Sequence, residues 1–139
     1  MTTERQYRTE AIVLKRSDFG EADRVLTLYT PERGKMRVVA KGVRRITSRK
    51  AGHVELFVRS RCMIHKGRDL DILVQAESVE TFRALREDLR RAACAYLAAE
   101  LLDGFTSEGE EQAGIYDLLA ETLRRLSEGR DLWLATHYF

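Results

Sequence analysis

Apolar and polar residues alternate along much of the first 80 residues, which is the pattern of β-strands that bury one face. Segment 35–41 shows it most clearly. One of its faces carries Met36, Val38 and Ala40. The opposite face carries Lys35, Arg37 and Lys41. The alternation predicts a strand with a buried apolar side and a cationic outer side.

The same periodicity predicts strands over residues 7–16, 22–30, 35–41, 53–65 and 70–78. The inward positions expected in the last two are Val54, Leu56, Val58, Cys62, Ile64, Leu70, Ile72, Val74 and Ala76. Pro31 and Gly34 indicate a tight turn between the second and third strands. Five short strands in this order are typical of an OB-fold barrel, although a Tudor-like or SH3-like barrel fits the periodicity almost as well.

Near Val79 the period changes from that of strands to that of helices. We expect a first helix with Thr81 as its cap, ending near Gly104, whose apolar positions are Phe82, Leu85, Leu89, Ala92, Ala93, Tyr96, Leu97 and Leu101. A second helix is expected to end near Gly129, with a stripe formed by Ile115, Tyr116, Leu119, Leu123 and Leu126. A third helix is expected from Asp131, and it either docks on the first two or continues beyond Phe139 in the full-length protein.

The predicted fold class is therefore α+β: a five-stranded OB-fold β-barrel in residues 1–80, followed by an α-helical domain in residues 81–139. Charge supports this division. The chain has 139 residues and a net charge of +2. Residues 1–80 hold 17 Lys and Arg against 11 Asp and Glu, whereas residues 81–139 hold 7 against 11. A basic part joined to an acidic part indicates two modules with different partners.

The basic charge is concentrated in segment 33–50, RGKMRVVAKGVRRITSRK, which contains no Asp or Glu. A positive strand that runs into a positive loop suits the phosphates of a polyanion. The alternative is a solvated charged surface. The predicted DNA-binding residues are Lys35, Arg37, Lys41, Arg44, Arg45, Arg49 and Lys50.

Aromatic side chains near these charges are candidates for stacking on bases. The candidates are Phe57, Tyr29 and Phe19. Phe57 is the best of them, because on a strand it would share a face with Arg59 and Arg61. The alternative for each is packing in the core, which we favour for Tyr29.

The sequence shows no pattern that indicates catalysis. Cys62 and His65 have a spacing found in metal sites, but an odd offset places them on opposite faces of a strand. We therefore expect no enzyme activity, no metal and no cofactor. No apolar run approaches the roughly 20 residues that cross a bilayer, so no membrane contact is expected. The two cysteines, Cys62 and Cys94, favour a reducing cytoplasm.

Several short motifs, in order, carry a family resemblance. They are a GE-x-D turn (Gly20, Glu21, Asp23), a T-x-x-x-G-K hairpin (Thr30, Gly34, Lys35), the run A-K-G-x-R-R (Ala40 to Arg45), Ala76-Glu77, and Y-L-x-x-E-L (Tyr96 to Leu101). Together they span nearly the whole chain. In their order and spacing they resemble the bacterial DNA repair and recombination protein family RecO.

The resemblance implies an OB-fold and a helical domain that bind single- and double-stranded DNA and anneal complementary strands. It also implies that the protein works with RecR and single-stranded DNA-binding protein to load the RecA recombinase, in the nucleoid of the cytoplasm. The family's basic positions on the third strand fall on Arg37 and Lys41. RecO proteins are longer, and some carry a Cys-rich zinc site in a later part with no counterpart in this sequence.

The acidic C-terminal tail of single-stranded DNA-binding protein is an expected ligand for the helical arginines Arg90, Arg91, Arg124 or Arg125. Two other functions remain open. One is an OB-fold module that binds RNA. The other is an interaction scaffold whose basic face binds an acidic protein.

Overall fold

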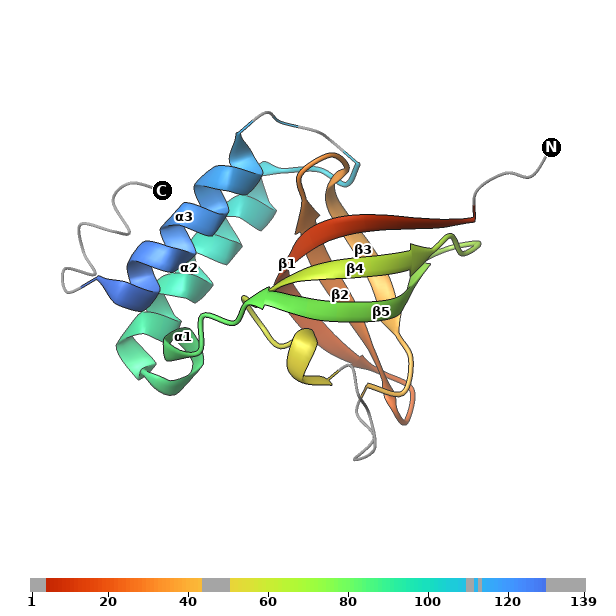
Figure 1. The fold of residues 1–139 in the computed structure, drawn as a ribbon, viewed down its shortest axis with the longest axis horizontal. Helices are drawn as coiled ribbons and strands as arrows, with labels where there is room; N and C mark the ends of the chain where they lie inside the picture. The colour runs from red at the N-terminus through yellow and green to blue at the C-terminus, as the bar shows by residue number, and fades with distance from the viewer. Residues whose placement is uncertain (1–4, 44–50, 110–111, 113, 130–139) are drawn as a thin grey trace.

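The computed structural model describes residues 5–43, 51–109, 112 and 114–129. Its strands are β1 (Gln6–Phe19), β2 (Asp23–Thr30), β3 (Gly34–Ala40), β4 (Arg59–His65) and β5 (Asp71–Glu80). They close into a barrel in the order β1-β2-β3-β5-β4 (Figure 1). All neighbouring strands are antiparallel except β3 and β5, which run parallel. Because this closed five-stranded ring is the OB-fold arrangement, the predicted fold class is confirmed.

Strand β1 closes the barrel by pairing with two neighbours. Its first half, from Gln6 to Ile12, pairs with β4, and its second half, from Ile12 to Phe19, pairs with β2. A register shift between Val13 and Lys15 lets it turn from one partner to the other, since a bulge adds a residue and increases local twist. The strand continues to Phe19 and turns at Gly20, where φ is 65°. The strand predicted over residues 7–16 therefore ended too early.

The expected strand over 53–65 is correct only in its second part. Strand β4 begins at Arg59, and a short 3₁₀ turn, η1 (Ala51–His53), precedes it. Between them the chain folds inward, with Phe57 at a φ of 68°. The Phe57 N–H donates to Val13 O at 2.9 Å, and the Val13 N–H donates to Val58 O at 3.3 Å. These bonds hold a compact, buried connection. Its alternating apolar and polar residues had wrongly indicated a strand.

Strand β5 contains a second irregularity that changes its inward residues. Met63 pairs with Gln75, and Ile64 pairs with Leu73, so Val74 is the extra residue of a bulge. Leu73 is buried as a result, whereas Val74 is exposed. The prediction that Val74 points inward was wrong, because a bulge moves every earlier side chain to the other face.

Three helices, α1 (Ala84–Glu87), α2 (Leu89–Phe105) and α3 (Ile115–Glu128), follow the barrel. Figure 1 shows α2 and α3 side by side and antiparallel at one end of the barrel. The predicted first helix is divided at Asp88, whose backbone is extended and whose carboxylate accepts hydrogen bonds from the N–H groups of Arg90 and Arg91. Asp88, not Thr81, is thus the residue that caps the long helix. The helix expected from Asp131 lies outside the described residues.

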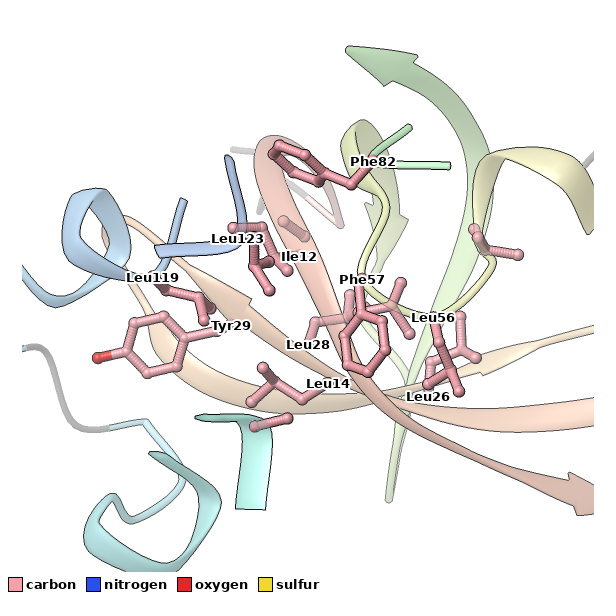
Figure 2. Packing of buried hydrophobic residues seen from close by; sticks show 14 of the residues in the cluster. Ile12, Leu14, Leu26, Leu28, Tyr29, Leu56, Phe57, Phe82, Leu119 and Leu123 are labelled. Atoms are coloured by element: carbon pink, nitrogen blue, oxygen red, sulfur yellow. The ribbon is translucent and has the colours of Figure 1, made fainter. Parts of the chain in front are cut away.

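Helices and barrel share one core. Figure 2 shows Leu119 and Leu123 of α3 near Ile12 and Tyr29 of the barrel, and all four belong to the same buried cluster. The predicted stripe of α3 is confirmed by its buried residues Tyr116, Leu119, Leu123 and Leu126.

The predicted face of α2 was wrong. The helix buries Ala95, Ala98, Ala99 and Leu102 and exposes Leu89, Tyr96, Leu97, Leu101 and Phe105. Small side chains let its backbone approach the core closely. Apolar residues of α2 lie on nearly every side of the helix. The spacing of its apolar residues alone therefore does not identify the buried face.

Candidate nucleic-acid interface

The outer surface of β1, β2 and β3 is built by strand register. Lys15 lies opposite Thr27, and Thr27 lies opposite Arg37. Directly opposed residues of antiparallel strands point to the same face, so these three side chains form a row across the sheet. Lys41, which follows the last residue of β3, is exposed. Of the predicted cationic outer side, Arg37 and Lys41 are therefore exposed.

Short turns fix this sheet, and the motif residues hold them. The Thr30 hydroxyl donates to Gly34 O at 2.9 Å and accepts from the Arg33 N–H at 3.1 Å. Gly34 has a φ of 65°, a conformation that L side chains seldom adopt. Asp23 Oδ1 accepts from the Gly42 N–H at 2.7 Å, which fixes the chain just after Lys41. Thr30, Gly34 and Asp23 thus act on backbone geometry.

Arg37 is half exposed, with 51% of its side chain accessible, and it makes an ion pair with the helical part of the chain. Its Nε donates to Glu108 Oε1 at 2.7 Å. Exposed ion pairs are worth about 0–1 kcal/mol, because both groups remain well solvated. A phosphate therefore competes with Glu108 at little cost. Lys41 is exposed, and its side chain has no partner among the described residues.

Lys35 differs from its two neighbours, and the expectation that it is free to meet a phosphate was wrong. Only 12% of its side chain is accessible. Its ammonium donates to Asp103 O at 3.0 Å, Asp103 Oδ1 at 3.0 Å and Thr106 O at 2.8 Å. A lysine has three N–H donors, and all three are used. Lys35 binds the carboxyl end of α2, where a cation is favoured by the helix dipole.

Asp103 is held between two lysines, since Lys15 Nζ lies 2.8 Å from its Oδ2. The hydrogen bond from Lys15, followed by that from Lys35, lowers the pKa of Asp103. The carboxylate therefore remains ionised at neutral pH and joins β1 and β3 to α2. Sequence reasoning missed this contact, because Lys35 and Asp103 are 68 residues apart.

The basic loop after β3 is only partly described. Arg44, Arg45, Arg49 and Lys50 lie outside the described residues, so their role in DNA binding stays a prediction.

The structure separates the three aromatic candidates. Phe57, the preferred one, is 1% exposed and packs edge-to-face on Tyr96 with ring centroids 5.3 Å apart. It is a core residue, so the expectation of an exposed stacking ring was wrong. Tyr29 is buried as expected (Figure 2). Phe19 is 53% exposed at the end of β1.

The four helical arginines also differ in what they contact. Arg124 donates to both oxygens of Glu80, with its Nε at 3.0 Å and its Nη2 at 2.8 Å. Arg125 pairs with Glu121 at 2.9 Å, and Arg91 donates to Leu126 O. The Arg90 side chain is exposed and has no partner in the described part of the chain. Of the four, Arg90 is thus the most accessible to an acidic ligand.

A charged network that sequence reasoning missed joins the barrel to α3. Arg59 of β4 donates to Glu10 Oε1 at 2.7 Å and to Glu80 Oε1 at 2.6 Å, and the Tyr116 hydroxyl donates to Glu10 at 3.1 Å. The hydrogen bonds from Arg124 and Arg59 lower the pKa of Glu80. These contacts orient the helical part against the barrel, and nothing in the sequence pattern connects them.

We also searched the described residues for metal sites, disulfides and membrane-spanning helices. Within residues 5–43, 51–109, 112 and 114–129, no three His, Cys, Asp or Glu side chains are grouped as a metal ion requires. Cys62 and Cys94 are both free thiols. Among the helices of this part, none is long and apolar enough to cross a membrane.

Comparison with known proteins agrees with the motifs. The family model described as Recombination protein O N terminal matches residues 1–82, and the one described as Recombination protein O C terminal matches residues 86–139.

Curated relatives carry the same name. Proteins called DNA repair protein RecO are 51% identical in Desulforudis audaxviator, over 91% of this chain and 51% of the relative, and 48% identical in Roseiflexus sp., over 91% of this chain and 44% of the relative. The protein of that name from Dehalococcoides mccartyi (strain BAV1) is 34% identical over 100% of this chain and 55% of its own length. The chain spans about half the length of these relatives. Since the two family models together match nearly the whole chain, the chain belongs to the RecO family.

Proposed function

We propose that this protein binds single- and double-stranded DNA through the outer face of β3 and the loop that follows it. The observation that carries the proposal is the position of Arg37 and Lys41. Arg37 is exposed on β3, Lys41 is exposed just after the strand, and the basic run without a compensating acid follows directly. Phosphate neutralisation by such side chains releases condensed counterions and drives binding without sequence preference.

In this proposal the protein acts in DNA repair as a recombination mediator. It anneals complementary strands, because cations at Arg37 and Lys41 reduce the repulsion between two phosphate backbones. With RecR it helps to load RecA on DNA covered by single-stranded DNA-binding protein. The accessible Arg90 is the first candidate for the acidic tail of that protein. Family membership and the names of the relatives, DNA repair protein RecO, support this role.

The test is fluorescence anisotropy of a labelled single-stranded oligonucleotide across a salt series. The charge-reversed variant Arg37→Glu/Lys41→Glu is compared with Arg83→Glu. Arg83 is the control, since it is an exposed cation at the N-cap of α1 that pairs with Glu87. Each lost phosphate contact lowers the log–log salt slope by about 0.7 on single strands, so the double variant should lose about 1.4 and fail to anneal.

Unchanged affinity and slope in the folded double variant would remove this face as the DNA site. Two competitors separate the other functions. An RNA of the same length that displaces DNA at much lower concentration would favour an RNA-binding module. An acidic peptide that does so would favour a protein-interaction scaffold.

A further inference from the structure

Phe19 occupies the edge of the cationic face. It lies opposite Asp23 across the β1–β2 pair, and Asp23 holds the Gly42 N–H just after Lys41. Arg24 pairs with Ala40, so Asp23 and Lys41 are the next neighbours across β2 and β3. Phe19 and Lys41 therefore lie on strands two apart, roughly 10 Å at the usual strand spacing, with Asp23 between them.

The ring of Phe19 does not contribute to the core. It is 53% exposed and is absent from the buried cluster that contains Phe57 and Tyr29. Space around the adjacent turn is open, since a Cβ placed on Gly20 would meet no atom within 4 Å. A large planar group can thus approach the ring without moving the backbone.

The charges around Phe19 favour a base over a phosphate. Glu21 follows in the turn and is exposed, and Asp23 lies opposite Phe19 across the β1–β2 pair. Asp18 precedes the ring but pairs with Arg24 at 3.4 Å. The carboxylates of Glu21 and Asp23 repel a phosphate placed beside the ring, whereas Arg37 on β3 and Lys41 just after it attract phosphates. A nucleotide with its phosphate at the lysine therefore directs its base towards Phe19, where carboxylates also accept hydrogen bonds from exocyclic amino groups.

We propose that Phe19 is a base-stacking residue that makes this face select single-stranded over double-stranded DNA. This inference rests on the proposed function, because stacking requires the phosphates to be held by Arg37 and Lys41. Base faces are accessible in a single strand and covered in a duplex. Stacking on an aromatic side chain is worth about 1–3 kcal/mol per base, which is about 5- to 150-fold in affinity.

The test compares Phe19→Leu, which keeps an apolar side chain, with Phe19→Trp, which keeps an aromatic one. Affinities for a single strand and for a duplex of the same length are measured at one salt concentration. Phe19→Leu should weaken single-strand binding by at least fivefold and leave duplex binding and the salt slope unchanged. Phe19→Trp should retain the affinity, and its added tryptophan fluorescence should be quenched by the single strand.

Phe105→Ala is the control, since Phe105 is an aromatic residue of α2 that is 81% exposed. Equal single-strand affinity in Phe19→Leu and the parent protein, with the Arg37→Glu/Lys41→Glu variant impaired, would overturn the stacking role alone. A parent protein that binds neither DNA would overturn the proposed function, and the stacking role with it.

Discussion

Glu108 Oε1 lies 2.7 Å from Arg37 Nε, so a carboxylate that follows α2 forms an ion pair with a cation of the proposed DNA face. The two residues are 71 positions apart in the sequence. The contact is reinforced by the backbone, because Glu108 forms a β-bridge with Lys35. If DNA binds as proposed, its phosphate competes with this carboxylate, and we expect the helical part to tune the affinity of the barrel for DNA.

Replacing Glu108 by Gln should strengthen DNA binding. The variant removes a negative charge from the face and frees Arg37 for phosphate. An exposed ion pair is worth up to about 1 kcal/mol, which predicts an increase of up to about fivefold in single-strand affinity at low salt. Anisotropy titration measures it, with Glu128→Gln at the end of α3 as the control. No gain over that control would mean that Glu108 does not compete with DNA.

Replacing Lys35 by Gln should destabilise the protein without changing the DNA salt slope. The Lys35 ammonium donates hydrogen bonds to three acceptors at the end of α2. Hydrogen bonds from charged groups contribute about 1.5–3 kcal/mol each to the free energy of unfolding when both partners are shielded from water. We expect a loss of about 1–3 kcal/mol in urea unfolding. Lys41→Gln should show the reverse, with unchanged stability and a smaller salt slope. A reduced slope in Lys35→Gln would place Lys35 at the DNA after all.

Asp103 predicts how stability depends on acid. Its pKa is lowered in the folded protein by Lys15 and Lys35, so the native state binds fewer protons there than the unfolded chain. Its contribution is full above the unfolded pKa of about 3.9 and is lost as pH falls through the lower folded pKa. Urea unfolding at pH 7 and near pH 3 measures the free energy of unfolding at each pH. The difference between the two values should be smaller in Asp103→Asn than in the parent protein. An equal loss in parent and variant would contradict the assignment.

Phe57→Ala should be a folding variant, since its ring lies in the core. Truncation of a buried Phe costs about 3–5 kcal/mol. The residue also has a φ of 68°, a conformation that Ala tolerates no better than Phe. Urea or thermal unfolding measures the loss, and DNA affinity of the folded fraction should be unchanged. A well-folded Phe57→Ala protein that no longer binds single strands would restore the stacking role first expected for it.

How well each element could be predicted from the sequence depends on the residues that determine its buried face. The faces of β3 were predictable in its first part, because Met36 and Val38 alternate with Lys35 and Arg37 and no bulge interrupts the pairing with β2. The face of α2 was not, since Ala98 and Leu97 are both apolar and only packing distinguishes them. Phe57 was misassigned because its left-handed backbone leaves no trace in an alternating pattern.

The candidate site was predictable in charge and not in pairing. The sequence identifies the cations of β3, but it does not indicate that Asp103 accepts from Lys35 or that Glu108 accepts from Arg37. Asp103 lies in the last turn of α2 and Glu108 follows that helix, and only the folded chain brings both acids to the sheet. Phe19 was considered from its position near the charges, and its exposure in the structure gives the reason to prefer it.

The bridge between Lys35 and Glu108 also bears on self-association. Strand β3 pairs with β5 only at Val38 and Val39, so its first half has a backbone edge on that side. The Gly109 N–H donates to Lys35 O at 2.9 Å and covers part of this edge. Uncovered strand edges are templates for pairing between molecules. Residues 1–80 without the helical part would thus be prone to aggregate. In the whole chain, the segment after α2 covers this strand edge and blocks its pairing with another molecule.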